Sequence, residues 1–221
     1  MVESPVATHR RGYLAGELVV LFVVAPFAIW YVMRAWSMPL PHLLAPLLVL
    51  VVALLAFDRT FSWRRTFSTG FSVRTLLRIL ALFVVTAAAV GFLVAILDPN
   101  GFLSLPRFLP RLWLVIMIGY PLISVTIQEL VYRVFFFHRY GPLFAGNPIA
   151  FVVANALLFG LGHVMFENAI AVAATTAGGA LFAWRYQTTR SFWAVALEHA
   201  LYGNFVFTIG LGRYFFTGNS W

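Results

Sequence analysis

The chain has 221 residues, of which 62% are hydrophobic and only 10% charged, and its mean hydropathy is +0.91. A soluble domain is nearer half apolar and a quarter charged, so this composition excludes a water-soluble globular fold and predicts that lipid solvates most of the surface. The net charge of +8 comes from arginines scattered between apolar runs, which indicates membrane topology and argues against nucleic-acid binding. Cysteine is absent, which excludes disulfides and thiolate metal sites.

The apolar runs predict an all-α, polytopic transmembrane bundle. A polar tail over residues 1–12 precedes the first span, and no cleavable signal peptide is evident. A turn signal over 98–101 ends the third span, the two prolines within 102–110 predict an interfacial loop, and Pro121 is expected to kink the fourth span. The seven predicted spans cover 13–35, 43–57, 75–97, 111–139, 149–166, 168–186 and 191–210.

The sixth predicted span is rich in small residues between Ala171 and Ala180, a composition that lets helix backbones approach closely in lipid. The chain contains no tandem repeat and no flexible linker. We therefore expect one integral membrane domain over residues 1–221.

The arginines predict the orientation of the bundle. With seven spans and the N-terminal tail in the cytoplasm, most arginines outside the spans fall on the cytoplasmic side, as the positive-inside rule requires. The cytoplasmic set is Arg10, Arg11, Arg59, Arg64, Arg65, Arg74, Arg139, Arg185 and Arg190. The opposite side receives only Arg34, Arg107, Arg111 and Arg213.

The fourth predicted span carries strongly polar residues at Gln128, Glu129 and Arg133. An ionisable side chain at mid-membrane costs about 3 kcal/mol or more and is a functional hypothesis by default. Glu129 and Arg133 are four residues apart, so they share a helix face and can form an ion pair. Such a pair could also be purely structural and let both charges reside in lipid.

The fifth span ends in Phe159-Gly160-Leu161-Gly162-His163. The two glycines thin the helix and would admit a close neighbour or a substrate. A lone intramembrane histidine is more often a hydrogen-bonded packing residue than a catalytic one. A catalytic role for His163 is therefore supported only together with other polar residues.

The seventh span contains His199, Tyr202 and Asn204. His199 and Tyr202 are three residues apart on one face, whereas Asn204 lies about 140° round an ideal helix from His199. His199 and Asn204 can line one cavity if the cavity is broad or if the helix distorts at Gly203. Asn204 could instead hold two helices together by a hydrogen bond.

Two further acids lie outside these clusters. Glu17 lies one turn inside the first span, near the basic tail, and we interpret it as structural. Glu167 follows the fifth span, and we interpret it as a surface loop residue. Neither is assigned to the site.

Together, three spans contribute a carboxylate, two imidazoles and an amide, the groups of a water-activating hydrolytic site. Glu129 would take a proton from water, and one imidazole would position that water. Histidine and asparagine donors would stabilise the oxyanion formed on a peptide carbonyl. Arg133 would orient Glu129 and keep it ionised despite burial.

At these residues the sequence resembles the CPBP family, the CAAX proteases and bacteriocin-processing enzymes also called the ABI family. The motifs of that family are Glu-Glu-x-x-x-Arg, Phe-x-x-x-His and His-x-x-x-Asn or a close variant. They correspond here to Gln128 through Arg133, Phe159 through His163, and His199 through Asn204, in the same order along the chain. The resemblance covers residues 115–210.

The resemblance implies an intramembrane endopeptidase that cleaves a membrane-associated or lipidated peptide, in a bacterial inner membrane. It assigns the water to His163 and the oxyanion pocket to His199 and Asn204. Members are classed as metalloproteases, and Glu129, His163 and His199 could then hold one divalent metal such as zinc. The same residues also suit a metal-free mechanism, and the sequence leaves both open.

The sequence departs from the family pattern at two positions. Gln128 replaces the first glutamate, and its neutral amide cannot act as a general base. Gly203 occupies the usual asparagine position, one residue before Asn204. Either Glu129 is the base, or the protein is a non-catalytic pseudoprotease that binds peptides in the same cavity.

A third interpretation is a proton pathway through Glu129, His163, His199 and Glu198. A transporter of this kind commonly contains an inverted repeat with paired broken helices, and the sequence shows none. We therefore rank it behind the peptidase and the pseudoprotease.

Overall fold

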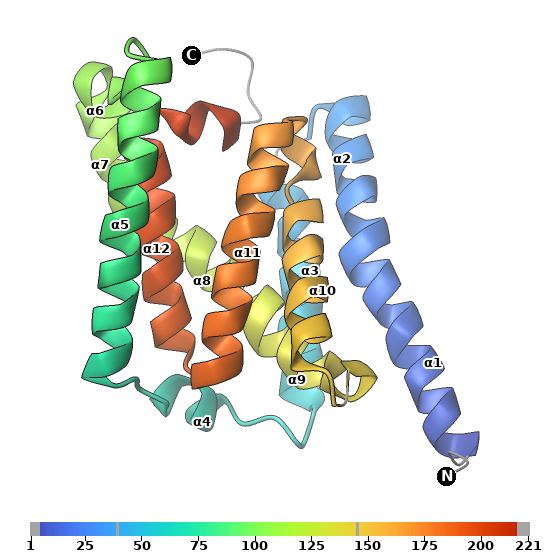
Figure 1. Ribbon diagram of the computed structural model, residues 1–221. Helices are drawn as coiled ribbons and strands as arrows, with labels where there is room; N and C mark the ends of the chain where they lie inside the picture. Colours follow the sequence, from blue (N-terminus) through green and yellow to red (C-terminus); the bar gives the residue numbers. More distant parts are fainter. Residues whose placement is uncertain (1–4, 39, 145, 216–221) are drawn as a thin grey trace. The chain divides into compact units, whose positions relative to one another are not determined.

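The computed structural model describes residues 5–38, 40–144 and 146–215, apart from the side chains of 5–9 and 41 (Figure 1). Every regular element within these ranges is helical, which confirms the predicted all-α class. The chain forms two compact units, each made of two separate segments. The first unit comprises residues 1–62 and 131–187, and the second comprises residues 63–130 and 188–221.

The elements of the first unit, up to its boundary residues, are α1 (Pro5–Val19), η1 (Val20–Val24), α2 (Ala25–Trp36), α3 (Leu40–Phe57), η3 (Leu130–Phe135), α9 (Phe136–Tyr140), η4 (Gly141–Phe144), α10 (Pro148–Leu161), η5 (Val164–Phe166) and α11 (Ala169–Thr189). Those of the second unit are α4 (Trp63–Ser68), α5 (Val73–Leu97), α6 (Ser104–Phe108), α7 (Pro110–Gly119), η2 (Tyr120–Val125), α8 (Thr126–Glu129), α12 (Phe192–Thr208) and η6 (Leu211–Phe215).

The starts of three long helices follow from local sequence. Ser72 and Ser191 accept hydrogen bonds from backbone N–H groups in the first turns of α5 and α12. Asn147 does the same for α10, where Pro148 occupies the first helical position. These caps satisfy N–H groups that have no partner within the helix.

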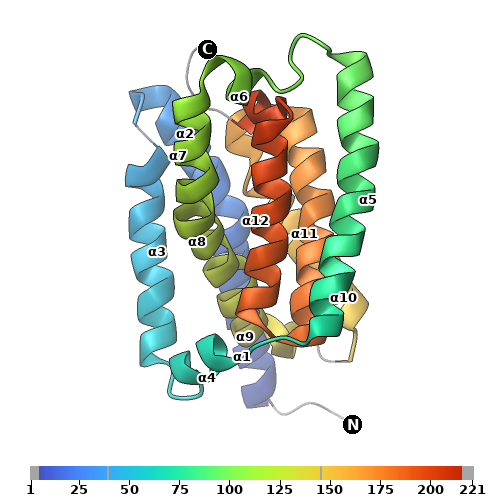
Figure 2. The ribbon, with the colours of Figure 1, turned by 90° about the vertical axis from the view of Figure 1, so that its left-hand side faces the viewer.

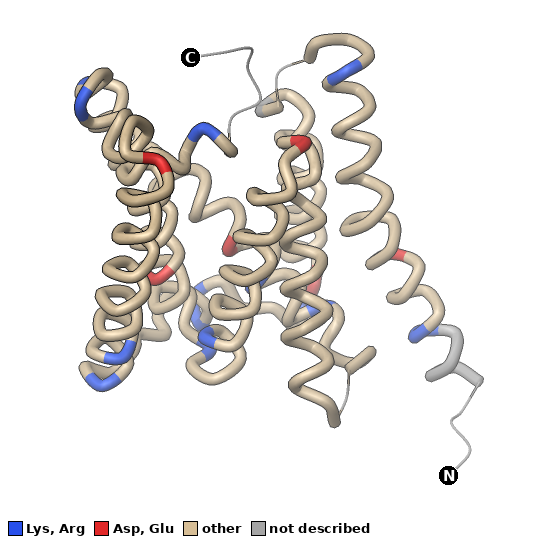
Figure 3. Tube along the Cα trace, turned by 45° about the horizontal axis from the view of Figure 1, so that its top comes forward, with Lys and Arg blue, Asp and Glu red and all other residues tan. Residues whose placement is uncertain are grey.

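Among the described residues, four helices are long and apolar enough to cross a membrane, namely Arg10–Trp36, Val73–Leu97, Pro110–Phe144 and Pro148–Phe166. The helix His42–Phe57 is apolar but shorter. The chain is thus an integral membrane protein, and long stretches of these helices carry no charge (Figure 3). A helix lies at each of the seven predicted spans, while the count of seven crossings stays a prediction.

Two predicted non-helical segments are partly helical. The segment 102–110 contains α6 and the first residue of α7, because proline is tolerated in a first turn, where its missing N–H would have no helical partner. The helix α1 begins at Pro5, so it covers most of the predicted tail 1–12, of which residues 1–4 lie outside the described ranges.

Helices α10 and α11 of the first unit approach closely where the sequence has small residues. A side chain at Gly160 would collide with the hydroxyl of Thr176, and one at Gly179 would meet Phe159 and the backbone of Ala156. The prediction that glycine and small residues bring these backbones together is therefore confirmed.

Glu17, interpreted as structural, and Glu167, interpreted as a surface loop residue, form ion pairs within the first unit. Glu17 accepts two hydrogen bonds from Arg139, at 2.9 and 2.8 Å, and one from Tyr140. Glu167 accepts from Trp30 and Arg34 at the end of η5, where its side chain is partly exposed. The Arg34 guanidinium lowers the pKa of Glu167 from its usual value.

In the second unit, α12 packs between α5 on one side and α7 with η2 on the other (Figures 1 and 2). Tyr202 of α12 shares a hydrogen bond of 2.8 Å with Thr86 of α5 and stacks edge-on against Phe83. On the other side, Trp113 of α7 donates to Thr208 of α12 at 3.0 Å. These contacts fix the rotation of α12 and so decide which way its other polar residues face.

Candidate active site

The helical run that carries Gln128 and Glu129 is irregular. Its short α-helical segment α8 lies between two π-helical segments, η2 and η3. The segment η2 contains Pro121, which has no N–H to donate and crowds the preceding turn, so the predicted distortion occurs there. Such wide turns in a helix are frequent at functional sites.

Glu129 and His199 are in direct contact within the second unit. Nδ1 of His199 lies 2.7 Å from Oε1 of Glu129, and the two residues are 5% and 0% exposed, respectively. A carboxylate offers only acceptors, so the ring donates through Nδ1–H, and in a neutral ring Nε2 then carries the lone pair. The carboxylate and imidazole predicted on the fourth and seventh spans therefore meet.

A tyrosine that the sequence analysis did not select completes this contact. The hydroxyl of Tyr120, the first residue of η2, lies 3.0 Å from Nε2 of His199. A side chain at Gly203 would overlap the Tyr120 ring, so the glycine leaves the space that the ring fills. Tyr120 adjoins the predicted kink, but a tyrosine in an apolar helix carries no signal of its own.

Gln128 makes a local contact. Its Nε2 donates to the hydroxyl of Ser124, one turn earlier, at 2.8 Å. The amide therefore occupies the position of the first family glutamate as a neutral hydrogen-bonding group.

Asn204 makes contacts of a different kind from those of His199. The helix α12 runs without a break from Phe192 to Thr208, so no distortion at Gly203 turns Asn204 toward His199. Its Nδ2 donates to the backbone carbonyl of Met117 in α7, at 3.1 Å, which is the interhelical bond considered above as the alternative. Its oxyanion role stays a prediction.

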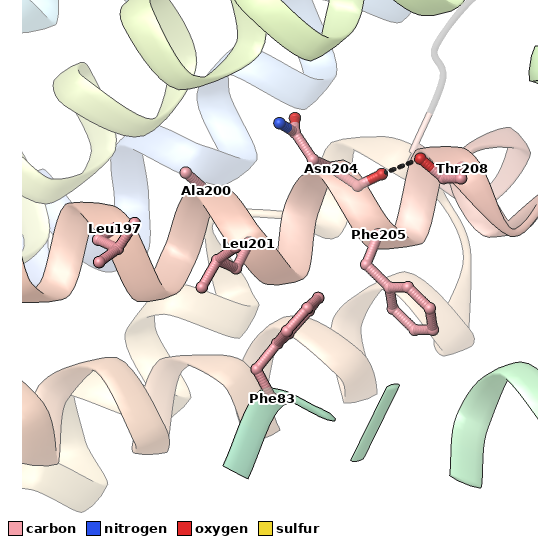
Figure 4. Close-up of a pocket in the computed structure, with 7 residues that line it drawn as sticks. All are labelled: Phe83, Leu197, Ala200, Leu201, Asn204, Phe205 and Thr208. Atoms are coloured by element: carbon pink, nitrogen blue, oxygen red, sulfur yellow. Dashed lines mark hydrogen bonds between the residues drawn. The ribbon is translucent and has the colours of Figure 1, made fainter. Parts of the chain in front are cut away.

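Asn204 also borders a cavity of about 440 Å³ between α5 and α12. Phe83 of α5 faces a row of α12 residues across it, and Thr208 donates a hydrogen bond to the backbone oxygen of Asn204 at 2.7 Å (Figure 4). The lining is almost entirely apolar, and its residues are Phe83, Leu197, Ala200, Leu201, Asn204, Phe205 and Thr208.

Arg133 belongs to the first unit and is fully buried there. Its guanidinium lies 4.4 Å from the centre of the Phe159 ring, and Nη2 is 3.4 Å from the carbonyl oxygen of Gly179. An aromatic face attracts a desolvated cation, which offsets part of the cost of burial. The predicted pairing of Arg133 with Glu129 stays a prediction.

His163 follows the last turn of α10 in the first unit. Its Nδ1 lies 2.7 Å from the carbonyl oxygen of Phe159, and the two rings pack edge to face. Because a carbonyl only accepts, Nδ1 carries the proton and Nε2 carries the lone pair. A neutral ring in this form can accept a hydrogen bond from water at Nε2, and the assignment of the water to His163 stays a prediction.

The ligation of a metal by Glu129, His163 and His199 stays a prediction. Nδ1 of His199 faces Glu129 and Nε2 faces the Tyr120 hydroxyl, so a metal at either nitrogen would replace one of these hydrogen bonds. Within each unit, the described residues contain no cluster of three histidine or acidic side chains suited to a metal ion. The chemistry proposed below uses the protein's own groups.

One comparison with known proteins gives a match. Residues 110–205 match the family model of the type II CAAX prenyl endopeptidase Rce1-like proteins. The matched range overlaps the predicted range 115–210 and contains all three motifs. Comparisons with curated proteins and with solved structures give no match. Over residues 110–205, the chain is similar to the type II CAAX prenyl endopeptidase Rce1-like family.

Proposed function

We propose that the protein is an intramembrane endopeptidase that hydrolyses a peptide bond of a membrane-associated or lipidated peptide, with Glu129 as general base. The observation that carries the proposal is the buried hydrogen bond of 2.7 Å between His199 and Glu129. The imidazole N–H is directed at one oxygen of Glu129, and a carboxylate in this position can accept a proton from water.

The reaction follows from that protonation state. Glu129 takes a proton from water while the water oxygen bonds to the peptide carbonyl carbon, and the carbonyl oxygen becomes an oxyanion. When the oxyanion collapses, the C–N bond breaks and the amine takes the proton back from Glu129. The products are a carboxylic acid and an amine, and Glu129 is regenerated as a carboxylate.

The family match supports the substrate class, since the matching family acts on CAAX prenyl peptides. A lipidated peptide partitions into the bilayer, where a protein of this hydropathy can meet it. The probe of choice is a farnesylated fluorogenic peptide that ends in a CAAX sequence, presented in detergent micelles to the purified protein.

We expect Glu129→Gln to lower kcat by about 10²- to 10⁴-fold, the range for loss of a general base. Asp58→Asn is the matched control, because Asp58 also pairs with a histidine, His138, but outside the proposed site. Equal activity of wild type and Glu129→Gln would refute the role of Glu129.

Gln128 supports the second candidate, a pseudoprotease that binds peptide without cutting it. Its amide donates to Ser124 and cannot act as a base. Gln128→Glu separates the candidates. An inert wild type with an active Gln128→Glu variant favours the pseudoprotease, whereas an active wild type that depends on Glu129 favours the peptidase.

A further inference from the structure

Tyr120 connects two residues of α12 that are one turn apart. Its hydroxyl is 3.0 Å from Nε2 of His199, and the two rings meet at 78° with their centres 6.0 Å apart. The Tyr120 ring also packs against Gly203, where any side chain would collide with the ring. All three residues lie in the second unit.

The direction of the hydrogen bonds follows from the carboxylate. Glu129 accepts from Nδ1 of His199, so Nε2 of the neutral ring is an acceptor and the Tyr120 hydroxyl is its donor. A histidine tautomer is set by the bonds made at its two nitrogens. Tyr120 and Glu129 thus favour the same tautomer from opposite sides of the ring.

Loss of the tyrosine hydroxyl would remove one of these two constraints. The ring could then place its proton on Nε2, which would turn the Nδ1 lone pair toward the carboxylate of Glu129. Two acceptors in contact repel each other, so the imidazole would rotate away and Glu129 would lose its N–H donor.

We propose that Tyr120 is a positioning residue, whose hydroxyl holds His199 in the Nδ1–H tautomer against Glu129 and whose ring depends on the space at Gly203. The identities of residues 120 and 203 are therefore coupled. The effect on catalysis rests on the proposed function, whereas the tautomer of His199 does not.

The first test reads the tautomer directly and needs no activity. Protein with ¹⁵N-labelled histidine in detergent micelles is studied by NMR, and His199→Gln identifies the His199 signals among those of the five histidines. We expect wild type to show a protonated Nδ1 and a hydrogen-bonded, unprotonated Nε2. Tyr120→Phe, which removes only the hydroxyl, should shift the Nε2 signal toward a mixture of tautomers.

Two glycine variants test whether the Tyr120 ring depends on the space at Gly203. Gly203→Ala should change the His199 signals in the same direction as Tyr120→Phe, because the added methyl group displaces the ring. Gly119→Ala is the matched control, since a Cβ at this neighbour of Tyr120 would meet nothing within 4 Å. Circular dichroism and gel filtration verify that each variant is folded.

The second test measures cleavage of the farnesylated peptide. We expect Tyr120→Phe to lower kcat by about 10- to 100-fold with KM unchanged, the size of effect of one hydrogen bond to a reacting pair. Unchanged His199 signals in Tyr120→Phe, or an Nε2–H tautomer in wild type, would overturn the inference. A wild type that shows the expected tautomer but cleaves nothing would instead overturn the proposed function.

Discussion

Two carboxylate–imidazole pairs of the described residues have different surroundings. In the second unit, Glu129 and His199 meet at 2.7 Å with almost no exposure, and Tyr120 supplies the next hydrogen bond. In the first unit, Asp58 and His138 meet at 3.0 Å with about a quarter of each side chain exposed.

The surroundings decide what each pair can do. Asp58 accepts further bonds from the hydroxyl and the backbone N–H of Thr60, and these bonds, with His138, lower its pKa from 3.8 to about 2. A carboxylate held this strongly in its charged form is a poor proton acceptor. Glu129 lies among apolar helices where water does not compete for it, so the same pair of groups is suited to chemistry there.

The comparison predicts, first, a large difference in stability. His199→Ala should lower the free energy of unfolding by about 3–5 kcal/mol, because it takes one partner from a buried pair. His138→Ala should cost about 1 kcal/mol or less, because water and Thr60 still solvate Asp58. Unfolding by sodium dodecyl sulfate in mixed micelles measures both, and equal losses would refute the distinction.

The second prediction concerns the pH dependence of the exposed pair. The Asp58 pKa is lower in the folded chain than in the unfolded chain, so the charged carboxylate stabilises the fold above about pH 4. That contribution disappears as the pH falls through about 2.

Thr60→Val removes the hydroxyl donor and should raise the pKa of Asp58 toward 3.8. The variant should be less stable than wild type by about 1 kcal/mol at pH 6, and the difference should vanish near pH 2. Denaturation curves at several pH values measure it. In an Asp58→Asn background, Thr60→Val should show no pH-dependent difference, and a persistent one would contradict the assignment.

The smallest effect is expected at a third, more exposed pair. Arg34 and Glu167 lie 2.6 Å apart, but their side chains are 62% and 46% exposed. Arg34→Gln should cost the least of these changes at low salt, and the difference should disappear near 1 M salt, where the screening length is about 3 Å. The loss from His199→Ala should persist at the same salt concentration, and its disappearance would argue against a buried pair.

The sequence predicted much of the fold because the relevant signals are local. Apolar runs and turn signals located the long helices, and the close contact at Gly160 followed from the small residues of α10 and α11. Segment 102–110 was misjudged, because two prolines that indicate a loop also fit the first turns of helices.

The candidate site was predicted only in part. Glu129 and His199 were selected because ionisable groups are costly in lipid, and that cost is visible in the sequence. Tyr120 was missed because a tyrosine in an apolar helix is unremarkable until a histidine is found within 3.0 Å of it. The spacing of Asn204 from His199 allowed either a shared cavity or an interhelical bond, and the bond to Met117 is the one observed.

The sequence by itself determined that this protein is a helical membrane protein with a CPBP-like set of polar residues. Those properties depend on composition, periodicity and short motifs, each confined to one stretch of chain. Only the tertiary structure decided which polar groups meet within a unit. The π-helical segments around α8 change the direction in which successive side chains point, and the packing of α12 against α5 and α7 fixes its rotation. The spacing of residues along the sequence predicts neither effect, because each arises from contacts between residues far apart along the chain.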